Sequence, residues 1–213
     1  LASAKNKVQG VSLKAESRRK KVDSLQSELS KATAALTDAK NRVKMLSDMQ
    51  RDYEGFSRAV KSVMHQVERG AMHGVHGPVS ALIATEDKFV TAIDTALGAS
   101  ASSIVVDTSA DGKRCIEYLK RTDGGRATFL PIDTIRPNIL RETGLETQKG
   151  CFGTADRLVT FEKRYAAIVQ NLLARTVVSE NMDTALALAR AYGHRFRIVT
   201  LDGQILQAGG AMT

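Results

Sequence analysis

The first third of the chain carries apolar residues at a seven-residue repeat. With Val8 at heptad position a, the a and d rows hold apolar residues or Tyr at twelve of fourteen positions, the exceptions being Arg18 and Gln50. No proline precedes Pro78. A narrow apolar stripe of this kind is typical of a coiled coil. We therefore expect residues 1–66 to form a coiled-coil arm segment, whose partner helix lies outside this sequence or belongs to another molecule.

From about residue 70 the pattern changes to short apolar runs, glycines and helical stretches, which favours an α/β fold. The tetrapeptide at 74–77 matches that at 150–153, a spacing of 76 residues. Six more pairs share this spacing: Leu82/Leu158, Glu86/Glu162, Lys88/Arg164, Phe89/Tyr165, Ala92/Ile168 and Leu97/Leu173. An internal duplication is the natural reading. We predict two pseudo-repeated subdomains of an α/β (α+β) fold, residues 67–140 and 141–213, preceded by the long coiled-coil helix.

Each predicted half also contains a strand, a helix and a second strand, which is the local unit of α/β folds. The first strands are expected at 104–107 and 176–179, the helices at 110–121 and 182–192, and the second strands at 127–130 and 196–201.

Composition limits the classes of function that fit. The net charge is +8, and residues 1–55 hold 12 Lys/Arg against 7 Asp/Glu, so polyanions such as DNA are candidate partners. Cys115 and Cys151 form no CxxC pair and no disulfide framework, which favours a reducing, cytosolic setting. The absence of a CxxC motif also argues against a zinc hook, in which such a motif ends a coiled-coil arm by binding zinc. No run of 18 apolar residues exists to span a membrane. The heptad pattern is already under way at Leu1, and we expect this sequence to be a piece of a longer protein.

Catalytic motifs give no support for an enzyme. Neither a G-x-x-x-x-G-K-[ST] phosphate loop nor a G-x-G-x-x-G fingerprint occurs. The stretch 107–112 resembles the start of an EF-hand loop but has Tyr118 where a bidentate Glu is required, so a helix cap is the better interpretation. His73 and His76 lack the further ligands of a zinc site. We predict no catalytic site, no metal site and no cofactor in this segment.

Two glycine pairs stand at the edges of predicted strands, Gly124-Gly125 in the first half and Gly209-Gly210 in the second. Glycine allows two backbones to approach closely because it has no Cβ atom. These pairs are either tight turns within one subunit or places where two subunits meet.

Several motifs in the second segment resemble the hinge of bacterial SMC (structural maintenance of chromosomes) proteins. They are GVHGPV at 74–79, TALG at 95–98, GRATFLP at 125–131, RIVTLDG at 197–203 and GGAMT at 209–213. GRATFLP is the most specific of them. The chain departs from the family pattern at Gln207-Ala208, where Asn-Pro is common, and it lacks the returning arm and the second glycine pair that usually follows residue 213.

The resemblance implies a hinge that homodimerises, with the first subdomain of one copy against the second subdomain of the other, and that touches DNA without sequence preference. The implied interface residues are Gly124, Gly125, Gly203, Gly209 and Gly210. The candidate phosphate contacts are Arg58, Lys61, Lys113, Arg114, Lys120 and Arg121. It further implies a cytoplasmic, nucleoid-associated parent protein whose distant ABC-type heads bind ATP, Mg²⁺, the kleisin and accessory subunits.

Two other hypotheses remain open at this point. The segment could be a purely structural coupler of coiled-coil arms that never meets DNA, or a small α/β nucleotide-binding protein. Salt-dependent DNA binding would distinguish the first from a DNA-contacting hinge, and stabilisation by nucleotides would indicate the second.

Overall fold

The computed structural model describes residues 2–51 and 53–213, and the side chains of 6–49 and 53–213. The chain divides into two compact units, Leu1–Glu54 and Gly55–Thr213. This boundary differs from the predicted coil end at residue 66. The helix ends earlier because Tyr53 takes a left-handed φ of 51° and Gly55 one of 89°, which an α-helix does not accept.

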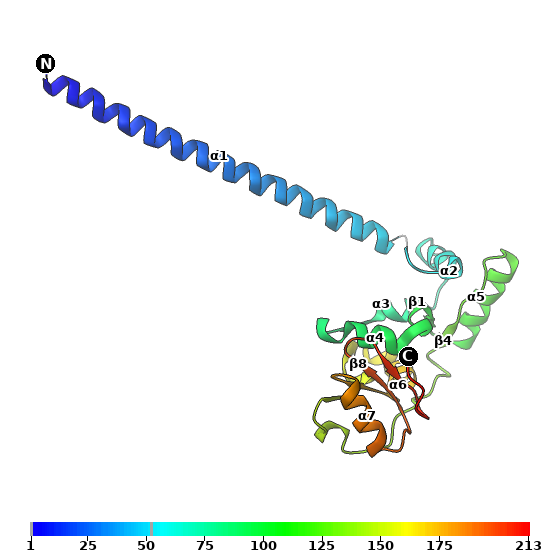
Figure 1. The fold of residues 1–213 in the computed structure, drawn as a ribbon. Coiled ribbons are helices and arrows are strands. Elements are labelled where there is room, and N and C mark those ends of the chain that lie inside the picture. The colour runs from blue at the N-terminus through cyan, green and yellow to red at the C-terminus, as the bar shows by residue number, and fades with distance from the viewer. Residues whose placement is uncertain (1, 52) are drawn as a thin grey trace. The chain divides into compact units, whose positions relative to one another are not determined.

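The first unit is helix α1 (Ala2–Arg51), 50 residues without a break (Figure 1). At about 1.5 Å per residue it is roughly 75 Å long. The predicted a and d residues lie open on its surface: Val8, Leu29 and Val43 are 71%, 67% and 64% exposed. An uncovered heptad stripe is what one strand of a coiled coil presents to its partner.

The second unit alternates short strands and helices. In its first half the elements are α2 (Arg58–Glu68), β1 (Val75–Pro78), α3 (Val79–Leu82), β2 (Ile83–Thr85), η1 (Asp87–Phe89), α4 (Val90–Leu97), η2 (Gly98–Ser102), β3 (Ile104–Val106), α5 (Ser109–Arg121) and β4 (Phe129–Pro131). In its second half they are η3 (Leu145–Thr147), β5 (Cys151–Thr154), η4 (Ala155–Arg157), β6 (Val159–Phe161), η5 (Lys163–Tyr165), α6 (Ala166–Leu173), β7 (Thr176–Ser179), α7 (Met182–Ala191), β8 (Arg197–Thr200) and β9 (Ile205–Leu206).

The two halves repeat one topology. The first forms a sheet of order β1-β3-β4, and the second a sheet of order β5-β7-β8-β9. In both, the first pair of strands is antiparallel and the next is parallel, as a strand-helix-strand unit requires. Even the register irregularities correspond, because one lies between Val75 and Gly77 and the other between Cys151 and Gly153. The internal duplication read from the 76-residue spacing is thus visible in the strand pairing.

A third, two-stranded sheet joins the halves to each other. Strands β2 and β6 pair antiparallel, with Ala84 opposite Thr160. These two residues are themselves 76 positions apart, so each half contributes the equivalent residue to the central pair. The halves are therefore related by an approximate two-fold axis that passes between β2 and β6.

The same approximate symmetry relates two aromatic contacts between the halves. Phe89 meets Phe152 edge to face at 5.3 Å, and at the equivalent positions Tyr165 meets His76 at 5.5 Å. In the second pair the Tyr165 hydroxyl is hydrogen-bonded to His76 Nδ1 (3.2 Å), and His76 Nε2 is hydrogen-bonded to the Asp107 carboxylate (2.7 Å). Burial raises the pKa of Tyr165. The contact of Phe89 with Phe152 is thus apolar, whereas the equivalent contact of Tyr165 with His76 is part of a chain of hydrogen bonds.

The main hydrophobic core draws on both halves, which explains why residues 55–213 form one compact unit. Its members include Ile93, Leu97, Val105, Ile168, Leu173, Val178 and Val199. A second cluster lies between α7 and its own sheet and contains Leu188, Phe196, Ile198 and Leu206.

Candidate dimerisation edges and basic surface

Strand β4 is one of the two outer strands of the first sheet among the described residues. Ile104 N–H donates to Thr128 C=O (2.8 Å), and Ile132 N–H donates to Val106 C=O (2.9 Å). Alternate residues of a strand direct their backbone groups to opposite sides. The N–H and C=O of Phe129 therefore point away from β3, and this edge can accept another strand.

The glycine pair before β4 divides into one buried and one exposed residue. Gly124 N–H donates to Leu119 C=O (2.8 Å), and a Cβ at Gly124 would lie 2.7 Å from the Leu119 side chain. Gly125 is exposed, with a φ of 90°. Gly124 thus closes the end of α5 within its own chain, whereas Gly125 lies at the open edge.

The second sheet ends in the segment 211–213, which pairs with β9. Ile205 and Thr213 exchange backbone hydrogen bonds at 2.9 and 3.0 Å, and Leu206 faces Met212 across the bridge. In the turn before it, Gly209 is exposed and a Cβ there would meet nothing within 4 Å, while one at Gly210 would lie 3.6 Å from the His194 ring. This second glycine pair therefore lies beside another open sheet edge.

Gly203 differs from the other predicted interface glycines. It lies in the turn between β8 and β9 with a φ of 87°, and a Cβ there would be 3.0 Å from both Thr91 and Thr95 of α4. Packing within a single chain accounts for this glycine. The structure does not bring Gly203 together with Gly125 or Gly209 at a free edge.

A groove of about 580 Å³ runs along the C-terminal half of α5, next to the β4 edge. It is lined by Ile116, Leu119, Lys120, Asp123, Gly125, Arg126 and Ala127. Ile116 is 42% exposed although its neighbour Leu119 is buried. Sequence reasoning overlooked Ile116 and Arg126, because an isolated apolar or basic residue carries no periodic signal.

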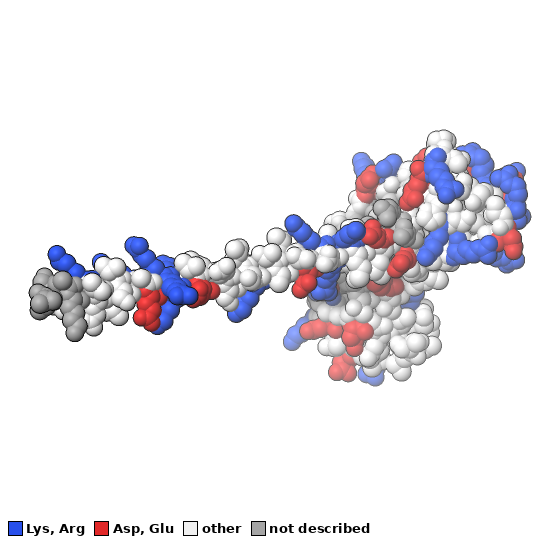
Figure 2. Space-filling view, turned by 90° about the horizontal axis from the view of Figure 1, so that it is seen from above, with Lys and Arg blue, Asp and Glu red and all other residues white. Residues whose placement is uncertain are grey.

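The six predicted DNA-contacting residues lie on two helices that touch each other. Arg58 and Lys61 lie on α2, and the other four lie on α5. A hydrogen bond of 3.1 Å between Ser62 and Tyr118 joins these helices. Lys and Arg side chains gather over the part of the second unit that carries α5 (Figure 2). The structure thus collects the predicted basic residues on one region.

Two of the α5 residues have acidic neighbours. Arg114 forms an ion pair with Asp111, and Lys113 Nζ lies 3.8 Å from Glu117. Asp111 also completes the capping box of α5, because the Thr108 N–H donates to its carboxylate (3.0 Å) and its own N–H donates to Thr108 Oγ1 (3.2 Å). The Thr108 hydroxyl and the Arg114 guanidinium lower the pKa of Asp111. The predicted helix cap at 107–112 is confirmed.

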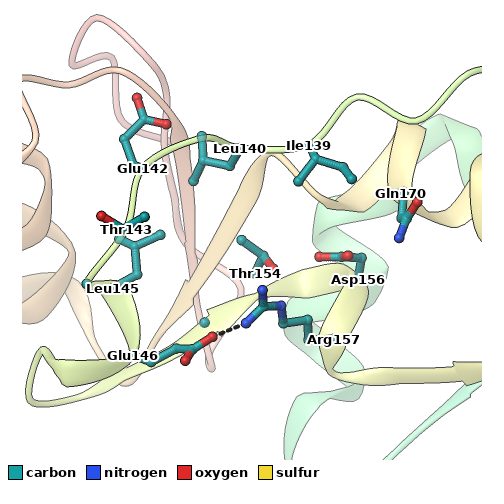
Figure 3. A pocket seen from close by; sticks show the side chains of 12 residues that line it. Ile139, Leu140, Glu142, Thr143, Leu145, Glu146, Thr154, Asp156, Arg157 and Gln170 are labelled. Carbon is teal, nitrogen blue, oxygen red and sulfur yellow. Dashed lines mark hydrogen bonds and ion pairs between the residues drawn. The ribbon is translucent and has the colours of Figure 1, made fainter.

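A second groove, of about 380 Å³, lies between the linker that follows β4 and the turn after β5. Glu146 forms an ion pair with Arg157 across it, and the buried Oδ1 of Asp156 has no hydrogen-bond partner. Figure 3 shows the Asp156 carboxylate turned toward the groove. No residue of the predicted interface or basic surface lines it.

A cysteine nucleophile, a metal site and a membrane-spanning helix would each place specific requirements on the described residues. Cys115 and Cys151 are free, and burial raises the pKa of both thiols, which disfavours the nucleophilic thiolate. Among residues with described side chains, no group of three or more His, Cys, Asp or Glu could hold a metal ion. Within the described ranges, no helix is both long enough and apolar enough to cross a membrane.

Comparison with known proteins agrees with this architecture. The Chromosome partition protein Smc of Bacillus subtilis is 40% identical over 203 residues, which is 94% of this chain and 17% of that protein. The corresponding protein of Clostridium kluyveri is 34% identical over 192 residues, 87% of this chain and 16% of its own length. The chain therefore spans about a sixth of the length of these curated relatives.

Solved structures give the same result. A crystal structure of an asymmetric dimer of the Geobacillus stearothermophilus SMC hinge domain matches with a TM-score of 0.80 and 37% identity, over 88% of this chain and 77% of that one. The Pyrococcus furiosus SMC hinge domain matches with a TM-score of 0.61 and 27% identity, over 79% and 85%. These neighbours are hinge domains rather than ATPase heads. The family model for the flexible hinge domain of SMC proteins matches residues 72–189, and the chain belongs to this family.

Proposed function

We propose that residues 55–213 homodimerise and thereby join two arms of a chromosome-partition protein. The observation that carries this proposal is that β4 and the segment 211–213 are both sheet edges of one compact unit, each beside an exposed glycine. An exposed strand edge is a template for pairing with another chain. Two copies related by a two-fold axis can pair β4 of each copy with the segment 211–213 of the other, which satisfies these four edges and closes a ring.

The test is the mass of the full chain in solution at micromolar concentration, by sedimentation. Helix α1 could also associate through its open stripe, so all variants carry Leu25→Lys and Leu29→Lys, which place charges on that stripe. We expect a dimer in this background. A monomer would refute the proposed function.

Substitution of the second glycine pair locates the interface. Gly209→Leu with Gly210→Leu should give folded monomers, because side chains would obstruct the approach of the partner strand. Gly70→Leu is a matched control, since Gly70 also has a positive φ of 70°, is exposed and has open space around its Cβ position. A dimer that survives the first pair of substitutions would remove this edge from the interface.

We further propose that the α2–α5 surface contacts DNA phosphates without reading sequence. Arg58, Lys120 and Arg121 are exposed, and clustered cations release counterions from the duplex. If four such residues engage B-DNA, log K should fall with log salt at a slope of about −3.6. The competing function, an arm coupler that never meets DNA, predicts no specific loss when these residues are changed.

Neutralising variants decide between the two. Lys113→Gln, Lys120→Gln and Arg121→Gln together should reduce the magnitude of the salt slope by about 2.7, while Arg114 is kept because it pairs with the cap of α5. The matched control neutralises three exposed arginines of the second half, Arg175, Arg190 and Arg195. Equal loss of binding in both sets would indicate a diffuse effect of net charge and contradict a defined surface.

For the parent protein we propose the remaining features of the family. ATP and Mg²⁺ would bind at distant heads, where the kleisin and accessory subunits would also attach, and the assembly would act on the nucleoid in the cytoplasm. The hinge would contribute dimerisation and DNA contact, with no cofactor of its own.

A further inference from the structure

The two halves of the second unit differ at one equivalent place, the outer edge of the last repeated strand. In the second half β9 covers the edge of β8. Its residue Leu206 is 1% exposed and packs in the cluster that contains Leu188 and Phe196. The following turn also covers the approach to β8, because Gly209 N–H donates to His194 C=O (3.0 Å).

In the first half the equivalent strand β4 has no such cover. The edge that carries Phe129 is open, and the groove of about 580 Å³ beside α5 occupies the place that corresponds to the turn and the apolar residue of the second half. Ile116 remains 42% exposed at this groove. The first half therefore has no strand equivalent to β9 and no apolar side chain equivalent to Leu206 at this edge.

The chain carries an apolar side chain suited to this place on its other open edge. Met212 is 62% exposed, and as the bridge partner of Leu206 it projects from the same face of the sheet. The hydrogen-bonded pairs on either side of it are Ile205 with Thr213 and Gln207 with Ala211. Its own N–H and C=O therefore point outward, toward an incoming strand.

Other exposed apolar residues of the unit fit this role less well. Phe152 is 38% exposed and already packs on Phe89. Ile139 is 52% exposed but lies on the linker between β4 and η3, in no strand. Val90 is 42% exposed at the start of α4 and is likewise on no strand edge.

We propose that Met212 of a second copy anchors the dimer by filling the groove beside α5, while the segment 211–213 of that copy pairs along the Phe129 edge. This inference rests on the proposed dimerisation and names its specificity-determining contact. The side chain lies over Ile116 and takes the place that Leu206 holds in the second half. A flexible, unbranched side chain such as Met adapts well to an open groove of this kind. The two-fold axis repeats the contact, so each dimer contains it twice.

A charge exchange across the contact tests the anchor, in the full chain with the Leu25→Lys and Leu29→Lys background. Met212→Glu should raise the dimer dissociation constant at least about 100-fold, since burying one such side chain is worth roughly tenfold or more and two are lost. Ile116→Lys should also weaken the dimer. The combination of Met212→Glu with Ile116→Lys should restore much of the lost affinity, because the new carboxylate and ammonium would meet.

Controls separate this inference from the dimerisation on which it rests. Met212→Leu and Ile139→Glu should leave the dissociation constant within about threefold of the parent, and circular dichroism checks that every variant is folded. A monomeric parent chain would refute dimerisation itself. A dimer unaffected by Met212→Glu would overturn the anchor alone. Loss of the dimer in Met212→Glu without recovery in the combined variant would place Met212 against some other surface and overturn its pairing with Ile116.

Discussion

The turn at Gly203 gives the sharpest test of packing within one chain against packing between chains. We predict that Gly203→Ala lowers the stability of each subunit, because the residue has a φ of 87° and its new Cβ would lie 3.0 Å from the Thr91 methyl and the Thr95 hydroxyl. A left-handed backbone costs a non-glycine residue about 1–2 kcal/mol, and overpacking costs about 1–3 kcal/mol more. The expected loss is therefore about 2–5 kcal/mol in the free energy of unfolding.

Urea unfolding followed by circular dichroism at several protein concentrations measures this loss. The drop in midpoint should be nearly the same at each concentration, since the clash lies inside one subunit. Thr91→Ser combined with Thr95→Ala removes the two contacted atoms, so Gly203→Ala in that background should cost only the backbone strain of about 1–2 kcal/mol. If Gly203→Ala leaves the midpoint unchanged but abolishes the dimer, the glycine belongs to the subunit interface and the reasoning fails.

Two further predictions concern hydrogen bonds. Asp111→Ala should destabilise the fold by about 1 kcal/mol through loss of the α5 cap. The folded pKa of Asp111 lies below its ordinary value of 3.8, so its carboxylate stabilises the fold above pH 4. This stabilisation is lost as pH falls through the folded pKa. If the free energy of unfolding of Asp111→Ala fell with acid as steeply as that of the parent chain, the prediction would be contradicted. His76→Phe should cost about 1–3 kcal/mol by leaving the buried Tyr165 hydroxyl unpaired, whereas adding Tyr165→Phe should recover most of that loss in urea unfolding, by copying the apolar contact of the other half.

Much of this fold could be predicted from local pattern. The heptad stripe indicated helix α1, and the 76-residue spacing indicated two halves whose strands and helices then lay close to the predicted ranges. The end of the coil was not predictable, because Tyr53 continues the apolar d row even though its backbone leaves the helix. The pairing of β2 with β6 was also out of reach, since it depends on contact between the halves and not on either segment alone.

The candidate site shows the same division. Glycine pairs marked the two open edges, but a glycine needed for an internal turn looks identical in sequence to one needed at an interface, and only the neighbours of its missing Cβ separate Gly203 from Gly209. Met212 and Ile116 carried no signal, because exposure is a property of the folded surface. Basic residues on α2 and α5 could be named in advance, whereas the involvement of Arg114 in the helix cap required the geometry of Asp111.

The duplication itself explains why this unit should associate with a second copy. If the two halves were identical, the outer edges of β4 and β8 would both be paired with a further strand or both be open. In neither case would one half provide a strand that the other half lacks. Here the second half continues into β9 and the segment 211–213, so it covers its own edge and ends with a new one, while the first half stops at β4. Each copy of residues 55–213 thus has a segment, 211–213, that can pair with another strand, and an open edge at β4 that can accept one. Within one chain β4 and the segment 211–213 belong to separate sheets, and a two-fold pair of chains can join β4 of each copy to the segment 211–213 of the other.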